Sequence, residues 1–148
     1  MTPIKQINKN GKNIFVFDSP VIAETPPYKL IFQCYNELLD KDMTMHNIPF
    51  RNNSSVIWIE NDKQEVLGGI VYDFIPDRYE GWICLSFTDP KYRGKGINAM
   101  MHTELYALLR KKGAVSVGSH VSINNQARLN SAKKVGLEPL YYRMFKKL

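Results

Sequence analysis

Most of the chain carries the hydrophobic pattern of β-strands. Alternating or unbroken runs of apolar residues, separated by Asn, Asp, Gly and Pro, predict a hairpin over residues 4–18. Further runs predict strands at residues 54–60, 65–75 and 81–88, with short polar turns between them. Because turns this short join antiparallel neighbours, these three strands should form a meander.

Three other stretches have helical periodicity. Apolar residues recur at steps of three and four over residues 28–40, 97–112 and 125–135, which places them on one helix face. Gly113 and Gly136 follow the last two stretches, at the position where glycine often ends a helix.

Two more strands complete the predicted fold. The alternating residues 114–121 should run parallel to residues 81–88, because a helical crossover joins the two segments. The C-terminal residues 141–148 predict a final strand. The order of elements predicts an α/β (α+β) fold, with a mixed, mostly antiparallel twisted sheet flanked by helices. A length of 148 residues favours one domain, spanning residues 1–148.

Composition indicates a soluble, cytoplasmic globular protein. The apolar content is 44%, and no stretch approaches the roughly 20 apolar residues of a membrane span. The N-terminus has no apolar core of the kind that signal peptides carry. Cys34 and Cys84 both lie in apolar runs, so we expect two buried thiols and neither a disulfide nor a metal site.

Charge is unevenly distributed. Residues 1–90 hold 8 Lys and Arg against 12 Asp and Glu, whereas residues 91–148 hold 12 against 2. The basic half suits a polyanion, and charge alone does not separate coenzyme A from nucleic acid. The acidic half suits either plain solvation or a weak attraction for a cationic amine.

The most distinctive chemistry lies at the start of the central helix. Gly94 and Gly96 lack a Cβ atom, so the backbone of residues 93–98 can curl closely round a ligand. Its free amides then point along the helix dipole, which forms a site for an anion, most naturally phosphate. Arg93 and Lys95 add positive charge beside it.

Two common phosphate-binding motifs do not fit this turn. A Walker loop needs four residues between its glycines, followed by Lys and Ser or Thr, and the chain has no such run. Residues 94–99 satisfy the dinucleotide pattern G-x-G-x-x-A, which should be followed after about twenty residues by an acid. No Asp or Glu lies between Glu104 and Glu138.

The segment from Pro90 to Ile97, PKYRGKGI, instead resembles the acyl-CoA signature of the GNAT superfamily of N-acetyltransferases, usually written Q/R-x-x-G-x-G/A. Its glycines and Arg93 match, and Lys91 departs at the first position. Residues 125–137, NQARLNSAKKVGL, resemble the helix that lies beside the pantetheine arm in that family.

This resemblance implies acetyl-CoA (coenzyme A) as co-substrate and a GNAT-like sheet that splays between residues 81–88 and 114–121. We expect a bulge near residues 87–89 to open a slot between these two strands. The expected cofactor-binding residues are Phe87 and Thr88, through their main chain; Arg93, Gly94, Lys95, Gly96, Ile97 and Asn98, through amides at the pyrophosphate; and Asn125 with Arg128, along the pantetheine and 3′-phosphate.

Acetyl transfer to an amine requires a base for the ammonium proton and an acid for the leaving thiolate. Glu80 is a candidate base, because histone-type members of the family have a glutamate at a similar distance before the signature. His120 and Asp73 are the other candidates.

The acid of many family members is a tyrosine four residues before the helix-ending glycine, and this chain has Ala132 there. Tyr142 or Tyr141 from the predicted last strand, or a water molecule, is expected to take its place.

The resemblance implies a primary amine as acceptor, on a small molecule or a peptide, and is compatible with a homodimer. The acceptor pocket is expected from residues 41–53, a helix and loop in the family, with Met43, Met45, His46, Phe50 and Arg51 as candidate lining residues. Two other functions stay open: a non-catalytic acyl-CoA binding module, in which Ala132 reflects lost chemistry, and a nucleic-acid binding domain. The basic residues have few stacking aromatics between them, which disfavours the nucleic-acid function.

Overall fold

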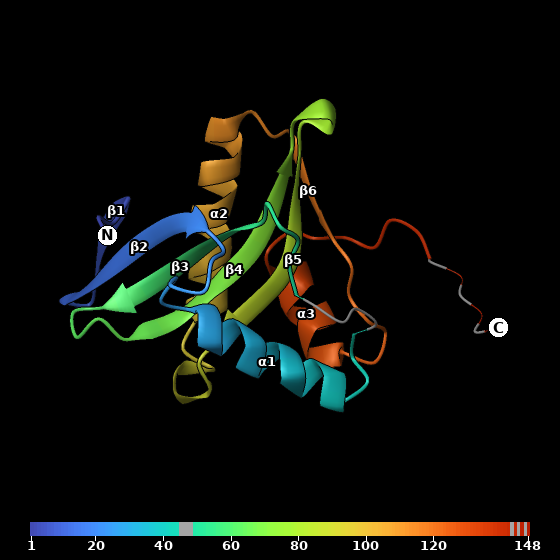
Figure 1. Cartoon of the computed structure of the whole chain (residues 1–148), viewed down its shortest axis with the longest axis horizontal. Helices are drawn as coiled ribbons and strands as arrows, with labels where there is room; N and C mark the ends of the chain where they lie inside the picture. The colour runs from blue at the N-terminus through green and yellow to red at the C-terminus, as the bar shows by residue number, and fades with distance from the viewer. Residues whose placement is uncertain (45–48, 143, 145, 147) are drawn as a thin grey trace.

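The computed structural model describes residues 1–44, 49–142, 144, 146 and 148. One six-stranded sheet runs in the order β1-β2-β3-β4-β5-β6 (Figure 1), with every neighbouring pair antiparallel except β5 and β6, which are parallel. The elements, in chain order, are β1 (Lys5–Lys9), β2 (Lys12–Pro20), α1 (Tyr28–Asp40), β3 (Ser55–Asn61), β4 (Val66–Ile75), the 3₁₀ turn η1 (Pro76–Arg78), β5 (Glu80–Thr88), the 3₁₀ turn η2 (Pro90–Tyr92), α2 (Ile97–Lys112), β6 (Ser116–Ser119) and α3 (Gln126–Lys134).

Most predicted elements are confirmed to within one or two residues. The β1–β2 hairpin turns at Asn10 and Gly11, whose positive φ angles of 54° and 79° suit a two-residue hairpin turn. Gly113, with φ of 100°, ends α2 by donating its amide to the helix carbonyls. The side chain of Asn125 caps α3 by accepting a hydrogen bond from the Arg128 amide at 3.0 Å.

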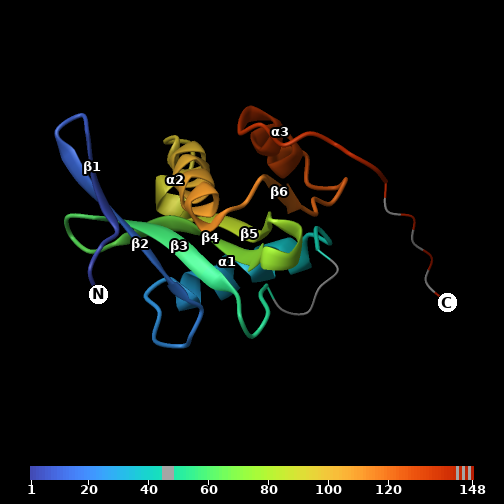
Figure 2. The same cartoon turned by 90° about the horizontal axis from the view of Figure 1, so that it is seen from above.

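Helices cover both faces of the sheet. Figure 2 shows α2 and α3 on one face and α1 on the other. The α2 face is filled by aliphatic side chains of the sheet together with Ile97, Met101, Leu105 and Leu109. The α1 face is more aromatic, and Phe17 and Trp58 stack there with ring centres 5.3 Å apart. The sheet therefore separates two cores, and any side chain of β4 or β5 belongs to one or the other.

A bulge in β5 opens the sheet. Val71 of β4 pairs with Leu85 and the next residue, Tyr72, pairs with Ile83, so Cys84 is the extra residue. The parallel pairing of β5 with β6 ends at the same level, with Ile83 opposite Ser119. The bulge was expected near residues 87–89. That prediction is wrong, because the bulge lies earlier in β5, at Cys84. The buried carboxylate of the neighbouring strand explains its position, as described below.

The seam between α2 and α3 is polar. His102 is buried, and its Nδ1 lies 2.7 Å from the Asn98 carbonyl oxygen, which accepts the Nδ1 proton. Its unprotonated Nε2 can then accept from the Arg128 guanidinium nitrogens, both at 3.5 Å. The Tyr106 hydroxyl donates to the Val135 carbonyl at 2.8 Å. Burial lowers the pKa of His102 to about 4, so the ring stays neutral and holds this arrangement at neutral pH.

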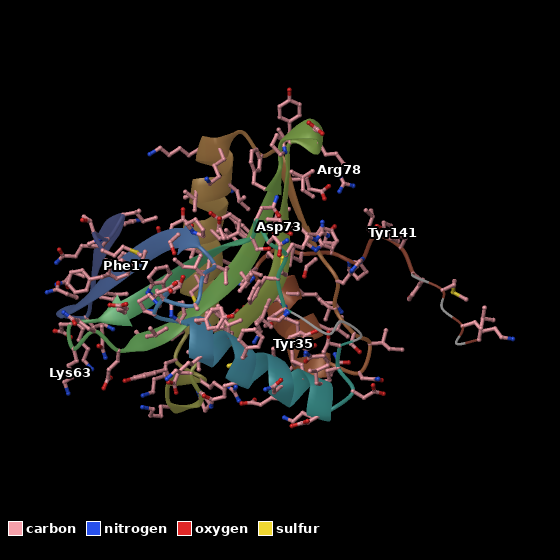
Figure 3. All side chains as sticks on the ribbon, viewed as in Figure 1. Phe17, Tyr35, Lys63, Asp73, Arg78 and Tyr141 are labelled. Carbon is pink, nitrogen blue, oxygen red and sulfur yellow. The ribbon has the colours of Figure 1, made fainter. Side chains whose placement is uncertain are left out.

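Two predicted elements are not found in the described residues. Residues 141, 142, 144, 146 and 148 belong to no strand, and the side chains from Leu140 to Met144 are 77–89% exposed where they are described. Figure 3 shows Tyr141 on a segment that leaves the body of the molecule. The described apolar residues of this segment therefore have no neighbouring strand and no apolar surface to pack against. The described residues on either side of 45–48 form no helix.

Glycine at position 69 is required by close packing. A Cβ atom there would lie 2.6 Å from the Ile57 carbonyl oxygen and 2.7 Å from the Phe87 ring. At Gly81 a Cβ atom would meet only side-chain atoms of Leu109, which can move. We expect Gly69→Ala to lower the free energy of unfolding by about 3 kcal/mol and Gly81→Ala by about 1 kcal/mol, measured by urea denaturation. Equal losses would contradict this account of the packing.

The neutral state of His102 predicts a pH-dependent stability. The unfolded chain binds a proton at this residue near its ordinary pKa of 6.5, whereas the folded chain binds it only near 4. The free energy of unfolding should therefore fall as pH drops from about 6.5 to 4, by at most about 3 kcal/mol. His102→Gln should remove this slope, and His120→Gln, at an exposed position, should keep it. Identical slopes in His102→Gln and the wild type would contradict the assignment.

Candidate functional site

The turn before α2 presents unpaired backbone donors. Gly94 and Gly96 both have φ of 77°, in the left-handed region, and Gly96 is the N-cap of α2 without a side-chain cap. Met100 makes the first helical hydrogen bond, to the Gly96 carbonyl. Within the described part of the chain, no acceptor bonds the amides of residues 94–99. This segment, the amide turn of residues 94–99, has the geometry of an anion site.

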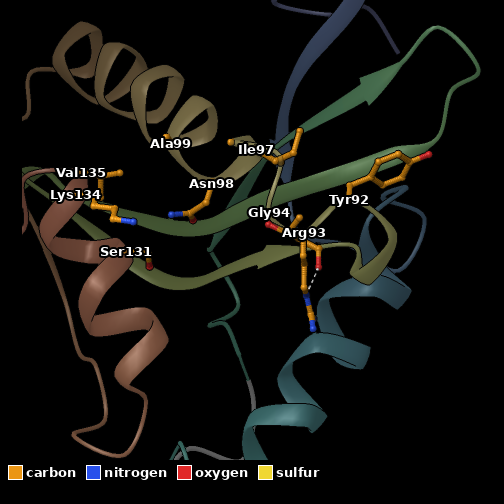
Figure 4. Close-up of a pocket in the computed structure, with 11 residues that line it drawn as sticks. Tyr92, Arg93, Gly94, Ile97, Asn98, Ala99, Ser131, Lys134 and Val135 are labelled. Carbon is orange, nitrogen blue, oxygen red and sulfur yellow. Dashed lines mark hydrogen bonds between the residues drawn. The ribbon is translucent and has the colours of Figure 1, made fainter.

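The turn forms one wall of a cleft of about 250 Å³. Figure 4 shows the other wall, which is the C-terminal end of α3, with Lys134 and Asn98 projecting into the space between the two helices. The lining residues are Thr88, Tyr92, Arg93, Gly94, Gly96, Ile97, Asn98, Ala99, Ser131, Lys134 and Val135. The turn before α2 and the helix α3 were singled out separately in the sequence. They border the same cleft.

Two anchors hold the turn in place. On one side the Tyr92 hydroxyl donates to the Glu65 carboxylate in the β3–β4 turn. On the other side the Arg93 side chain extends towards α1 (Figure 4) and donates to Glu37 at 3.0 Å. It also donates to the Thr88 carbonyl of β5 at 3.3 Å. The Arg93 guanidinium is thus paired with a carboxylate and lies away from the amide turn. Its amide still belongs to the turn, but the charge expected beside the phosphate comes from elsewhere.

Lysines supply that charge. Lys134 lines the cleft. Lys95 Nζ lies 5.6 Å from the ring centre of Tyr92, at the outer side of the turn. The helical periodicity of α3 could have indicated Lys134, because it lies three residues after Ser131, which lines the same cleft.

Asn98, Asn125 and Arg128 are engaged within the protein. The Asn98 side-chain oxygen accepts from Ser86 Oγ at 2.6 Å, which ties the start of α2 to β5. Asn125 caps α3, and Arg128 points into the α2–α3 seam towards His102. Neither Asn125 nor Arg128 lines the cleft. Their predicted contacts with pantetheine and the 3′-phosphate stay predictions.

Phe87 and Thr88 lie on the part of β5 that β6 no longer pairs with. Phe87 is buried in the α1-face core, so only its main chain is available to a ligand. Thr88 lines the cleft. The slot between β5 and β6 therefore opens beyond Ile83 and extends towards Thr88, as the prediction of a splayed sheet requires.

A polar cluster lies on the α1 face where the sheet opens. Asp73 of β4 is buried, and its Oδ1 accepts from Ser54 Oγ at 2.5 Å. The Cys84 thiol, on the bulge, donates to Asp73 Oδ2 at 3.4 Å, and Arg51 Nε lies 3.7 Å from the same oxygen. These bonds hold the extra residue of β5 over Asp73, which accounts for the place of the bulge.

Cys84 is not a nucleophile in this setting. Burial, together with the negative charge of Asp73, raises the pKa of Cys84 to about 12. A thiol with that pKa stays protonated at neutral pH, and the thiolate is the reactive form.

The candidate catalytic residues are separated by the structure. His120 follows the end of β6, at the slot, and its ring lies edge-on to Trp82 at 4.9 Å between centres. Trp82 pairs with Asp73, so His120 and Asp73 both lie next to Trp82. Glu80 lies at the opposite end of β5, paired with Ile75 and Ser116.

The candidate acid lies apart from this region, whereas the predicted pocket residue Arg51 borders it through its contact with Asp73. Tyr142 is 87% exposed after α3, and Ala132 is buried in α3. Phe50 packs against the α1-face core, and the predicted pocket residues Met45 and His46 lie outside the described residues.

Two features are absent from the described residues. No helix is long and apolar enough to cross a membrane. No group of three or more His, Cys, Asp or Glu side chains there is arranged to hold a metal ion.

Solved structures with this fold are similar at low sequence identity. An aminoglycoside N-acetyltransferase, AAC(6′)-Iy in complex with CoA, gives a TM-score of 0.67 at 12% identity, over 94% of this chain and 97% of that chain. An aminoglycoside acetyltransferase from an uncultured soil metagenomic sample, in complex with sisomicin, gives 0.65 at 15%, over 90% and 96%. A protein from Bacillus halodurans gives 0.71 at 15%, over 90% and 99%.

Sequence comparison identifies the family. No curated protein matches the chain. The family model described as Acetyltransferase (GNAT) family matches residues 20–137, which include α1, the whole β3–β5 meander, the amide turn and α3. The chain therefore belongs to the GNAT family of acetyl-CoA-dependent acetyltransferases.

Proposed function

We propose that the protein is an N-acetyltransferase that moves the acetyl group of acetyl-CoA to a primary amine. One observation carries the proposal: the unpaired amides of residues 94–99 border a cleft that Thr88 also lines, on the part of β5 that β6 does not pair with. The diphosphate of coenzyme A would bind to these amides. Pantetheine would then follow the cleft between α2 and α3 towards Phe87 and Thr88.

The free main chain of β5 suits the acyl-transfer step. The amine nitrogen attacks the thioester carbonyl carbon, the C–S bond breaks, and the coenzyme A thiolate leaves and takes up a proton. Charge develops on the carbonyl oxygen, and the β5 backbone amides beyond Ile83 that face away from β4 are the donors available to stabilise it. With Ala132 at the usual acid position, a water molecule or Tyr142 supplies the proton to the thiolate in this proposal.

We assign the base to His120. Its ring lies against Trp82, one residue beyond the last β5–β6 pair, and we expect the reacting carbonyl beside that end of the pairing. Glu80 pairs with Ser116 in the first β5–β6 pair. The buried carboxylate of Asp73 adds negative charge to the same face, which attracts a cationic amine. A direct role of Asp73 as base is the alternative.

A small cationic amine is the acceptor class that we propose. Two of the structures similar to this chain are aminoglycoside acetyltransferases, and Asp73 gives the acceptor face its buried negative charge. A peptide amine is the alternative. The free thiols of Cys34 and Cys84 support the cytoplasm as the place of action.

A non-catalytic acyl-CoA binding module is the second candidate function, favoured by Ala132 alone. Turnover with any amine in a mixed panel would exclude it.

Acetyl-CoA should stabilise the protein strongly. At about 100 times its dissociation constant a ligand adds about 2.7 kcal/mol, which corresponds to a rise in Tm of roughly 5–10 °C for this chain length. Gly96→Asp should abolish the rise, because it places a negative charge in the amide turn. Gly96→Ala is the matched control, since it causes the same strain at positive φ without the charge. NAD and ATP should give no rise.

A wild-type protein that shows no rise with acetyl-CoA would overturn the cofactor assignment. A folded Gly96→Asp variant with unchanged affinity would overturn the place of the diphosphate.

The base assignment predicts a contrast between two substitutions. His120→Gln should lower kcat/KM at neutral pH about 100-fold, because a general base typically contributes at least that much. Glu80→Gln should stay within a few-fold of the wild type. Steady-state kinetics with the amine that gives turnover in the panel would measure both. A larger loss in Glu80→Gln would move the base to Glu80, and a large loss only in Asp73→Asn would move it to Asp73.

A further inference from the structure

The N-terminal strand β1 lies along α2 by one of its faces. Residues Lys5, Ile7 and Lys9 alternate along β1, so their side chains share that face. Lys5 Nζ binds both carboxylate oxygens of Glu104 on α2, at 2.9 and 3.1 Å. Ile7 packs against the α2-face core. Two of the three side chains thus dock β1 on the helix.

The third side chain reaches the start of α2. Glu104 lies eight positions after Gly96, about 12 Å along a helix, and Lys9 lies four positions after Lys5, about 13 Å along a strand. The two lengths match, so Lys9 lies level with Gly96 when Lys5 lies level with Glu104. A Cβ atom built on Gly96 would lie 3.8 Å from Lys9 Nζ. Lys9 therefore stands beside the amide turn, although the sequence separates them by more than 80 residues.

Lys9 meets no negative charge there. Within the described residues no carboxylate or other acceptor bonds its ammonium group, and residues 1–17 contain no acid. Its surroundings are instead the unpaired amides of residues 94–99 and the positive end of the α2 dipole. Lys134 lines the same cleft. The ammonium group of Lys9 and the positive end of α2 repel each other unless an anion lies between them.

We propose that Lys9 binds the diphosphate of coenzyme A, and that the β1–β2 hairpin is a third wall of the cofactor site. This inference rests on the proposed function, because it takes coenzyme A as the ligand of the amide turn. The ammonium group donates to a diphosphate oxygen that the turn amides hold from the other side. The Lys5–Glu104 ion pair sets the position of the strand and so carries Lys9 to Gly96.

The experiment is isothermal titration calorimetry of the wild type, Lys9→Gln, Lys9→Arg and Lys29→Gln with coenzyme A and with dephospho-coenzyme A. The second ligand lacks the 3′-phosphate and keeps the diphosphate. Lys9→Gln should raise Kd about tenfold for both ligands at low salt, the usual worth of a charge-assisted hydrogen bond. Lys9→Arg should restore most of the affinity. Lys29→Gln removes the same charge from an exposed position on α1 and should leave Kd unchanged.

Each outcome separates this inference from the proposed function. If the wild type binds neither ligand, the proposed function fails first. If the wild type binds both and Lys9→Gln binds them equally well, Lys9 is not a ligand. If Lys9→Gln loses affinity for coenzyme A alone, its partner is the 3′-phosphate and the diphosphate assignment is wrong. Thermal unfolding of the unliganded variants checks that each keeps its fold.

Discussion

The structure depends on a backbone turn whose hydrogen bonds its own chain leaves unmade. An α-helix begins with unpaired amides, and α2 begins with a glycine N-cap that offers them no side-chain acceptor. The Tyr92–Glu65 bond anchors this turn to the β3–β4 turn, and the Arg93–Glu37 ion pair anchors it to α1. Both anchors lie outside the turn, so they fix its shape without filling it. A preformed site loses little conformational entropy when an anion binds.

The second constraint is the bulge at Cys84. One extra residue ends the β5–β6 pairing at Ile83, turns a closed sheet into a slot, and places the Cys84 thiol on Asp73. The same residue thus opens the slot in which the thioester would lie and completes the polar cluster around Asp73. An apolar residue at position 84 would leave Asp73 with one bond fewer in a buried place, which costs about 1–3 kcal/mol.

Local elements were predictable, and their long-range partners were not. Periodicity, capping residues and turn residues located the hairpin, the meander and the three helices, because these signals lie within a few residues of one another. The direction of the Arg93 side chain depends on Glu37, 56 residues away, and the bulge depends on Asp73. Lys9 was counted in an acidic half of the chain, although it lies beside the basic half in space. The last strand was predicted from alternation alone, which does not reveal whether a neighbouring surface exists.

The proposed reaction divides its substrates between two faces of one sheet. The cleft lies on the α2 and α3 face, whereas Asp73 and Trp82 lie on the α1 face with His120 against Trp82. Strand β5 belongs to both sides, so thioester and amine would meet at its open edge beyond Ile83. The donors for the oxyanion there are main-chain amides, which are independent of side-chain identity. In this proposal alanine at position 132 is compatible with acetyl transfer, because the tyrosine hydroxyl of other members would assist the leaving thiolate and not the developing oxyanion. The extra residue in β5 matters more to the proposal, since the β5–β6 pairing ends where it is inserted and the edge beyond Ile83 is left open.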